Sequence, residues 1–365
     1  MLPVVMTLDA GGTNMVFSAM CDGKELVEPL VVPTIVDDLF ACLNAIKKGF
    51  ETIAHLLSVS PDAISFAFPG PADYTSGIIG DLPNFSAFRG GVALGPFLEY
   101  HFGIPVFINN DGNLFTYGEA FAGLLPEINA RLRAAGNPKR YKNLIGITLG
   151  TGFGGGVVID GNLLRGDNQV ASSFWCLPNK KYEGWIAEEC VSIRGVQRGY
   201  ARLSGDSTLY TPKEIYDIAE GMREGNRMAA VMAFEELGGV LGSSIVSAVS
   251  LIDGLVVIGG GLSGAAKYIF PALMRELRGQ IGMADGRCLS RLQTQVYNLE
   301  LAEEMKSFLT YEDCFVEVPG TNRKISYQTV CRTGVALTKM GTSRSIALGA
   351  YWFAVNELKN NRQRL

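Results

Sequence analysis

Two glycine-rich turns, far apart in the sequence, constrain the fold more than any other feature. The first, "TLDAGGTN" at residues 7–14, stands between two apolar runs, and the second, "LGTGFGG" at 149–155, does the same. Glycine permits a sharp turn between strands, and its missing Cβ lets backbone N–H groups approach an anion. A plain β-hairpin explains either turn alone. Two turns of shared composition favour a pair of hairpins that grip one polyphosphate.

The sequence around these turns predicts two repeated halves of sheet and helix. In the first half, strands are expected near residues 4–9, 15–20, 26–31, 63–68 and 105–109, and helices over 39–57, 92–102 and from 113 onward. The polar segment "LPEINARLRAAGNPKRYKN" is interpreted as an exposed linker between the halves. Strand, glycine turn and strand then recur at 143–163, and "LVVIGGGLSG" predicts a buried strand before a helix near 267–278.

These patterns suggest a discontinuous first domain. We expect residues 1–122 to be completed by the final helix, at 345–365, and the second domain to span 123–344. The second domain would contain an insertion near 285–335 that the pattern does not assign.

Length, charge and cysteine spacing narrow the class of protein. With 365 residues and 47% hydrophobic content, the chain suits two globular domains. A net charge of −4 without a basic stripe argues against nucleic-acid binding. The opening segment lacks the basic residues and apolar length of a signal or membrane helix, so a cytoplasmic protein away from membranes is expected. The seven cysteines show no CxxC spacing, which favours free thiols.

The segment "INNDGN" at residues 108–113 carries a candidate catalytic acid. Asn110 and Asp111 fall where a strand ends and a helix begins. One interpretation is a helix cap with no further role. The other is that Asp111, at the carboxyl end of a sheet strand, accepts the proton of an attacking hydroxyl group.

Six motifs, taken in order, resemble the ROK sugar kinases. They are "LDAGGTN", "FAFPGPAD", "LPNF", "INNDGN", "GITLGTGFGGGVVIDG" and "VVIGGGLSG", and they span roughly residues 4–265. The resemblance implies an α/β fold of two actin-like ATPase (ribonuclease H-like) domains around a central cleft. It also implies ATP-dependent phosphorylation of a hexose or hexose derivative, with Mg²⁺ and a small-molecule sugar as partners, and it leaves a homodimer open.

The resemblance further implies roles for single residues. Asp111 would be the general base, and Asp9 would hold Mg²⁺ or its water. The phosphate and nucleotide contacts would come from Gly11, Gly12, Thr13, Asn14, Thr151, Gly152, Gly154, Gly259, Gly260 and Gly261. The sugar contacts would come from Asn84, Asn110, Asp111 and Glu188. Glu189 is a close alternative to Glu188.

The chain departs from the family just before Glu188. Family members carry a Gly-Glu-x-Gly-His element and a cysteine cluster that binds a structural zinc, whereas this chain reads "ASSFWCLPNKKYEGWIAEEC". A gapless match places Ser173 at the glutamate and Cys176 at the histidine. We therefore expect no structural zinc and a sugar preference that can differ from glucose.

Further expectations concern the tryptophans, the histidines and the alternative functions. Trp175 and Trp185 either pack in a core or stack on a sugar ring, and core packing is the favoured interpretation. His55 and His101 fall in predicted helices away from the motifs, where packing or surface roles are expected. The alternative function is a sugar- or nucleotide-binding sensor with weak turnover. A DNA-binding regulator is disfavoured because Asp9 stands too early for a preceding helix-turn-helix domain.

Overall fold

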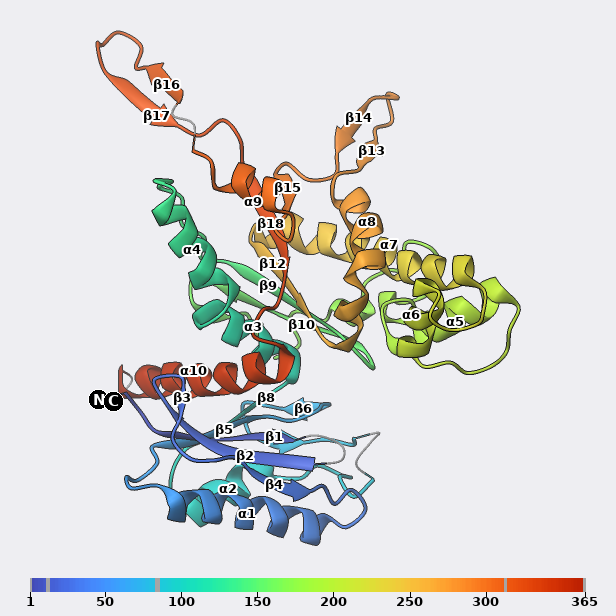
Figure 1. Cartoon of the computed structure of the whole chain (residues 1–365). Coiled ribbons are helices and arrows are strands. Elements are labelled where there is room, and N and C mark those ends of the chain that lie inside the picture. The colour runs from blue at the N-terminus through green and yellow to red at the C-terminus, as the bar shows by residue number, and fades with distance from the viewer. Residues whose placement is uncertain (1, 11–13, 83–85, 312–313, 364–365) are drawn as a thin grey trace.

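The computed structural model describes every residue except 1, 11–13, 83–85, 312–313 and 364–365. Two bodies make up the molecule, each built on a six-stranded sheet, and helix α10 (Thr342–Gln363) runs between them (Figure 1). This arrangement confirms the prediction of two halves of sheet and helix.

The two sheets share a pattern of strand pairing. In the first sheet the order is β3 (Lys24–Glu25), β2 (Asn14–Cys21), β1 (Val5–Ala10), β5 (Ala63–Ala67) and β8 (Val106–Asn109), and β4 (Leu30–Pro33) also pairs with β2. In the second it is β11 (Asn162–Leu163), β10 (Phe153–Ile159), β9 (Leu144–Leu149), β12 (Leu255–Gly259), β18 (Arg332–Leu337) and β15 (Gln295–Asn298). Each sheet contains an antiparallel hairpin, β1 with β2 or β9 with β10, whose first strand then pairs in parallel with the next. Both glycine-rich turns therefore join the strands of such a hairpin.

The first sheet is covered on its outer face by α1 (Leu39–Leu56) and α2 (Leu94–Phe102) (Figure 1). Helix α1 begins where the Asp38 side chain accepts a hydrogen bond from the Ala41 N–H at 3.0 Å, as an N-cap does. Its buried side chains, Cys42, Ile46, Phe50 and Ile53, recur every three or four residues and form the apolar stripe that the sequence predicts. Of the strand expected at 26–31, only the last two residues are found in a strand, at the start of β4, and the prediction is wrong for 26–29.

Two helices connect the halves. Helix α3 (Asp111–Phe121) packs against β9 and β10 of the second sheet, and α10 packs against α3, β5 and β1. The helices cross at Gly118 and Gly349, where an added Cβ would overlap the Ser345 or the Leu114 carbonyl oxygen of the facing helix. Glycine at both positions allows the close approach that fixes α3 between the sheets.

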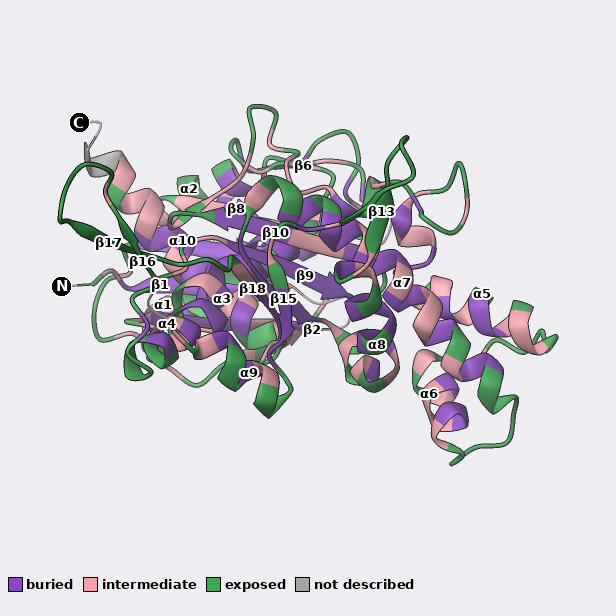
Figure 2. Ribbon diagram, turned by 90° about the horizontal axis from the view of Figure 1, so that it is seen from above, coloured by how far each residue is buried: buried purple, intermediate pink, exposed green. Residues whose placement is uncertain are grey.

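The second half has its own layer of helices, α5 (Ile193–Ser204), α6 (Pro212–Glu220), α7 (Arg227–Ile252) and α8 (Ala266–Leu277). Figure 2 shows the purple, buried strands at the centre of the molecule and α5 and α6 at one end. By length and composition α7 could cross a membrane, but 67% of its most apolar window is buried. It packs against α8 and α5 as a core helix.

Two segments differ from the sequence prediction. The supposed linker contains α4 (Leu124–Ala134), whose Leu125, Ile128 and Leu132 are buried, so the prediction of an exposed linker is wrong there. The supposed insertion at 285–335 includes β15, β18 and α9 (Ala302–Leu309), which belong to the second sheet and its cover. Two hairpins project from the body in Figure 1. One pairs β13 (Gln280–Gly282), which precedes the supposed insertion, with β14 (Cys288–Ser290), and the other pairs β16 (Cys314–Glu317) with β17 (Lys324–Tyr327).

Candidate active site

A cavity of about 690 Å³ lies where α3 meets the turn between β9 and β10. Both halves of the chain line it. The lining residues are 70–72, 74, 110, 111, 148–155, 169–173, 175, 188, 260 and 342. The cavity thus brings together the second glycine-rich turn, the "INNDGN" motif and the segment that departs from the family pattern.

Asp111 is placed in this cavity by the first turn of α3. The side-chain oxygen of Asn110 accepts a hydrogen bond from the Asn113 N–H at 2.6 Å, so Asn110 is the N-cap. One Asp111 carboxylate oxygen accepts from the Gly112 N–H at 2.8 Å. The cap and the cavity acid are therefore neighbouring residues, and the two interpretations of this motif apply to different side chains.

The negative charge of Asp111 contributes, after burial, to the raised pKa of two other groups in the first half. Burial, and secondly the negative charge of Asp111, raise the pKa of Asp9 at the end of β1. The same two causes raise the pKa of the Tyr74 hydroxyl, which donates to the Phe68 carbonyl oxygen at 2.9 Å. Asp9 therefore lies within the electrostatic influence of Asp111, although it is not itself among the residues that line the cavity.

The second glycine-rich turn forms one wall of the cavity, and Thr151, Gly152 and Gly154 all line it. Gly260 also lines it, with φ of 91°, and its N–H donates to the Thr342 hydroxyl at 2.8 Å. A side chain there would overlap the Leu149 carbonyl oxygen, which explains the glycine. Gly259 does not line the cavity but packs beneath the Phe115 ring, and Gly261 opens the short helix η3 (Gly261–Ala265).

Several predicted phosphate- and sugar-binding residues of the first half are not among the residues that the structure describes. Gly11, Gly12, Thr13 and Asn84 lie outside the described residues. Asn14 opens β2 and is exposed.

Glu188 lies on the short helix η2 (Ala187–Glu189) and lines the cavity. One of its oxygens accepts from the Phe153 N–H at 2.9 Å, and the other accepts from Arg194 at 2.8 Å. Glu189 pairs instead with Arg194 and Arg198, at 2.9 and 2.7 Å, and is not among the lining residues. Of the two alternatives, Glu188 is the one on the cavity wall.

The segment that departs from the family pattern supplies another wall. Ser173 lines the cavity and donates to the Val170 carbonyl oxygen at 2.7 Å, whereas Cys176 is exposed outside it. Trp175 lines the cavity and is 48% exposed, and Trp185 is 43% exposed. The expectation that both tryptophans pack in a core is therefore wrong, because Phe174 takes the core position beside Phe153.

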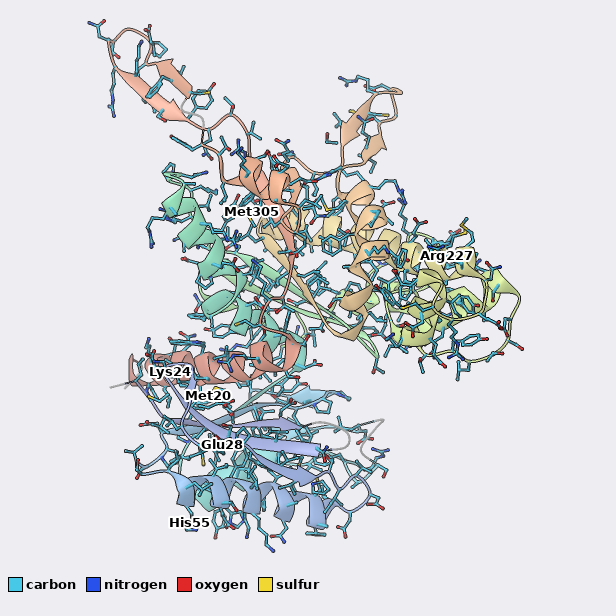
Figure 3. The ribbon with its side chains drawn as sticks, viewed as in Figure 1. Met20, Lys24, Glu28, His55, Arg227 and Met305 are labelled. Atoms are coloured by element: carbon cyan, nitrogen blue, oxygen red, sulfur yellow. The ribbon has the colours of Figure 1, made fainter. Side chains whose placement is uncertain are left out.

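The remaining metal and histidine expectations concern other parts of the chain. Among the described residues, no group of three or more His, Cys, Asp or Glu side chains is placed to hold a metal ion, and the absence of zinc stays a prediction. His55 lies on α1 at the outer edge of the first half in Figure 3, and His101 on α2 stacks edge-on against Phe97. Both stand apart from the cavity.

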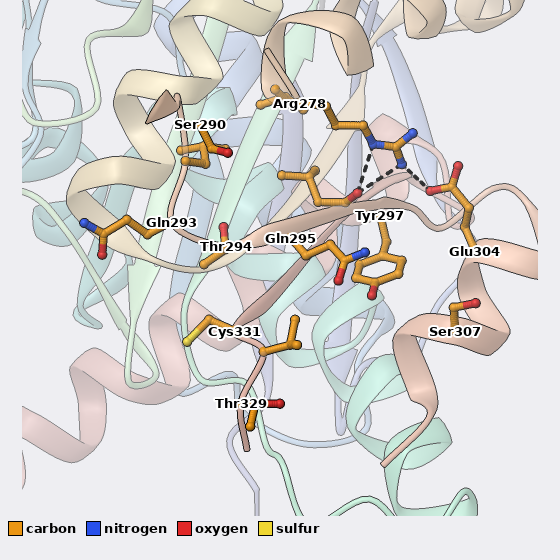
Figure 4. A pocket seen from close by; sticks show the side chains of 14 residues that line it. Arg278, Ser290, Gln293, Thr294, Gln295, Tyr297, Glu304, Ser307, Thr329 and Cys331 are labelled. Atoms are coloured by element: carbon orange, nitrogen blue, oxygen red, sulfur yellow. Dashed lines mark hydrogen bonds and ion pairs between the residues drawn. The ribbon is translucent and has the colours of Figure 1, made fainter. Parts of the chain in front are cut away.

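A second cavity, of about 700 Å³, lies near the bases of the projecting hairpins (Figure 4). Arg278 donates to the Val296 carbonyl oxygen at 3.0 Å and to the Glu304 carboxylate. The ion pair with Glu304 neutralises the Arg278 charge. None of the six motifs lines the second cavity.

Sequence reasoning missed Tyr74, Gln169 and Thr342 as lining residues. Tyr74 follows directly after "FAFPGPAD", so this motif gave a local signal. Thr342 joins the cavity only because α10 returns across the molecule, and no local pattern could indicate that.

The sequence model of the ROK family matches residues 5–284. The chain belongs to the ROK family. A glucokinase of Thermotoga maritima is 26% identical over 74% of this chain and 86% of its own length. An N-acetyl-D-glucosamine kinase of Vibrio cholerae is 29% identical over 70% of this chain and 83% of its own length.

Solved structures extend this likeness to the whole chain. The crystal structure of a glucokinase from Parabacteroides distasonis is 60% identical, with a TM-score of 0.89, and the match covers 97% of this chain and 98% of that one. A ROK glucokinase from Streptomyces griseus in complex with glucose and AMPPNP is 18% identical, with a TM-score of 0.56 and coverage of 96% and 98%, and shows the fold alone. The predicted α/β fold of two actin-like ATPase domains is confirmed.

Proposed function

We propose that this ROK-family sugar kinase transfers the γ-phosphoryl group of ATP to the primary hydroxyl group of a hexose, and that glucose is the substrate to test first. One observation carries the proposal. A single cavity joins an acid at the carboxyl end of a sheet strand to a glycine-rich turn of the opposite half. The choice of glucose is supported by the glucokinase that is 60% identical over nearly all of the chain.

Asp111 is proposed as the general base. Its carboxylate faces the cavity from the N-terminus of α3, and the Gly112 N–H bonds one oxygen and thereby orients the group. In phosphoryl transfer the protein mainly positions groups and neutralises charge, so one carboxylate suffices to accept the proton of the attacking hydroxyl. Removal of a general base should cost about 100-fold or more in rate.

Asp9 is proposed as the residue that holds Mg²⁺ bound with ATP. Burial and, secondly, the negative charge of Asp111 raise the pKa of Asp9, and oxygen ligands and surplus negative charge are what Mg²⁺ prefers. When bound, Mg²⁺ would neutralise charge on the phosphate oxygens. The charged side chains among the described lining residues, Asp111 and Glu188, are both acidic, so a polyphosphate needs such a cation.

The phosphates themselves are proposed to lie against backbone N–H groups. Thr151, Gly152 and Gly154 would bind one part of the polyphosphate from the second half. Gly11, Gly12, Thr13 and Asn14 would bind the transferred phosphate, and Gly259, Gly260 and Gly261 would pass near the nucleoside.

The sugar is proposed to bind between α3 and η2. Asn84, Asn110, Asp111 and Glu188 would contact its hydroxyl groups, because paired donors and acceptors discriminate between sugars. Ser173 and Trp175 also line the cavity, and Trp175 is proposed to stack on the sugar ring. We also propose that residues 1–122 with 345–365 and residues 123–344 move as two domains that close on the substrates.

Release of ADP from Mg-ATP, measured across glucose, N-acetylglucosamine, mannose and N-acetylmannosamine, tests the proposal. We expect turnover on one sugar and a loss of about 100-fold or more in Asp111→Ala. Asp160→Asn is the matched control, because Asp160 forms an exposed ion pair with Lys142 at 3.0 Å. Sugar binding by calorimetry without turnover on any sugar would favour the alternative of a sensor.

A further inference from the structure

Glu236 joins the segment at residues 179–190 to two helices of the second half. It lies on α7, and its side chain is only 8% exposed. One carboxylate oxygen contacts Lys181 Nζ and Arg202 Nη2, each at 2.5 Å, and the other accepts from the Tyr182 hydroxyl at 2.8 Å. Arg202 belongs to α5. One carboxylate therefore fastens two residues of the segment to both α5 and α7.

The same segment is closed on itself around the buried side chain of Asn179. Its oxygen accepts from the N–H groups of Lys181 and Tyr182, at 2.9 and 3.1 Å. Its nitrogen donates to the Ile186 carbonyl oxygen at 3.2 Å and to Cys190 Sγ at 3.3 Å. With both ends tied to one amide, the segment should move as a unit.

Cys190 and Tyr182 add donors to the Glu236 carboxylate. The Cys190 sulfur lies 3.8 Å from its Oε1 atom. Burial raises the pKa of the Cys190 thiol, and burial followed by the hydrogen bond to Glu236 raises the pKa of Tyr182 to about 12. Both groups therefore keep their protons at neutral pH and remain donors.

Glu188 is the residue of this segment that reaches the cavity. It stands two positions before Cys190 and accepts a hydrogen bond from the N–H of Phe153, the first residue of β10. Without Glu236, two cations, Lys181 and Arg202, would face each other over an uncompensated space. Both cationic side chains are partly exposed, at 44% and 45%, so solvent screens their repulsion. The segment is expected to move outward mainly because it loses the carboxylate that holds Lys181 and Tyr182.

We propose that Glu236 is a positioning residue for sugar recognition, which holds segment 179–190 so that Glu188 stays on the cavity wall. The inference rests on the proposed function of the cavity. Glu236 lies outside the lining residues, so it acts through the segment. Displacement of a binding group by about 1 Å can cost up to about 100-fold in activity, which makes such a fastening measurable.

The test compares Glu236→Ala and Glu236→Gln with Glu220→Ala in the full chain. Glu220 is a matched control, since it accepts from Lys267 at 2.9 Å and from the Tyr268 hydroxyl at 2.8 Å, away from the segment. In Glu236→Ala we expect KM for glucose to rise about 10-fold or more while KM for ATP changes less than about twofold. Glu236→Gln keeps an acceptor for Tyr182 and should fall between Ala and wild type. Glu220→Ala should leave both constants unchanged.

A merely structural role would give another pattern. If Glu236→Ala lowers kcat and thermal stability but leaves KM for glucose unchanged, the proposal is wrong. Hydrogen exchange gives a readout that does not depend on turnover. We expect faster exchange at the Lys181 and Tyr182 amides in Glu236→Ala, with α1 of the first half unchanged, and equal exchange would overturn the proposal. If the wild-type protein phosphorylates no sugar, the proposed function fails, and the exchange result still decides the role of Glu236.

Discussion

Gly112 of α3 and Gly155 of β10 approach so closely that a Cβ atom on Gly112 would stand 2.5 Å from the Gly155 backbone nitrogen. The residue after the proposed base thus rests directly on the β9–β10 hairpin of the other half. Neither glycine is needed for a turn at this point. Gly112 lets Asp111 and the second glycine-rich turn meet across the junction, whereas a Cβ atom on Gly155 would meet the Gly146 carbonyl oxygen and the Phe174 ring of its own half.

This approach predicts the effect of Gly112→Ala. The new methyl group would meet backbone atoms, which cannot rotate away, so α3 must shift or the junction must open. We expect a loss of about 1 to 3 kcal/mol of unfolding free energy, as in other overpacked sites, together with reduced kcat. Chemical denaturation and ADP release measure the two effects.

Gly239→Ala is the control for that substitution. Gly239 lies within α7, and an added Cβ there meets nothing within 4 Å. Alanine should stabilise the helix by about 0.5 to 1 kcal/mol. A neutral result in Gly112→Ala would show that the junction is not as tight as the described contacts require.

The pairing of Asp9 with Asp111 predicts a pH-dependent stability. Because burial and the Asp111 charge raise the pKa of Asp9, the folded protein binds that proton more tightly than the unfolded chain does. The unliganded protein therefore loses stability as pH rises from the usual carboxyl range through the raised pKa. Asp111→Asn removes the second cause, and burial, the larger one, remains.

We accordingly expect Asp111→Asn to unfold at a higher temperature than wild type at pH 7, while the proposed role of Asp111 as the base predicts that the variant has lost activity. The difference should disappear below the usual carboxyl range, where Asp9 is protonated in both proteins. Thermal unfolding without nucleotide or metal, recorded between pH 3 and pH 8, checks this, with Asp160→Asn as the control. A constant difference across that range would contradict the coupling between the two carboxylates.

Much of this arrangement could be predicted from the sequence, and the exceptions have physical causes. The hairpins were predictable because glycine and alternating apolar residues mark them locally. Helix α4 was missed because proline, glycine and basic residues masked Leu125, Ile128 and Leu132, whose spacing is that of a helix. Thr342 and Glu236 act through contacts between distant segments, which no local pattern records.

The fluorescence of Trp175 is expected to report ligand binding in the cavity. Its ring lines the cavity and is half exposed, so an occupant would change its surroundings. We expect the tryptophan fluorescence to change on addition of sugar and the change to be lost in Trp175→Phe. Trp185→Phe is the control, because Trp185 stacks on Tyr182 and under Arg198 outside the cavity. A signal that persists in Trp175→Phe would place the sugar elsewhere.

The neighbouring acids Glu188 and Glu189 allow a direct test of the proposed sugar contact at η2. Glu188 bonds the Phe153 N–H and Arg194, and Glu189 pairs with Arg194 and Arg198. Because both acids pair with Arg194, substitution of either one removes one carboxylate partner from Arg194. If Glu188 binds the sugar, Glu188→Gln should raise KM for glucose about 10-fold. A 10-fold change corresponds to about 1.4 kcal/mol, which is close to the contribution of one hydrogen bond to a charged group.

Glu189→Gln should leave KM for glucose close to wild type, because an exposed ion pair contributes little. The measurement is steady-state ADP release at saturating Mg-ATP with varied glucose. Equal increases in KM would mean that Arg194, rather than a carboxylate, organises this wall. An increase confined to Glu189→Gln would move the sugar contact to the other acid. The contrast is decisive because both acids pair with Arg194 of α5, but only Glu188 also accepts from the Phe153 N–H and lines the cavity.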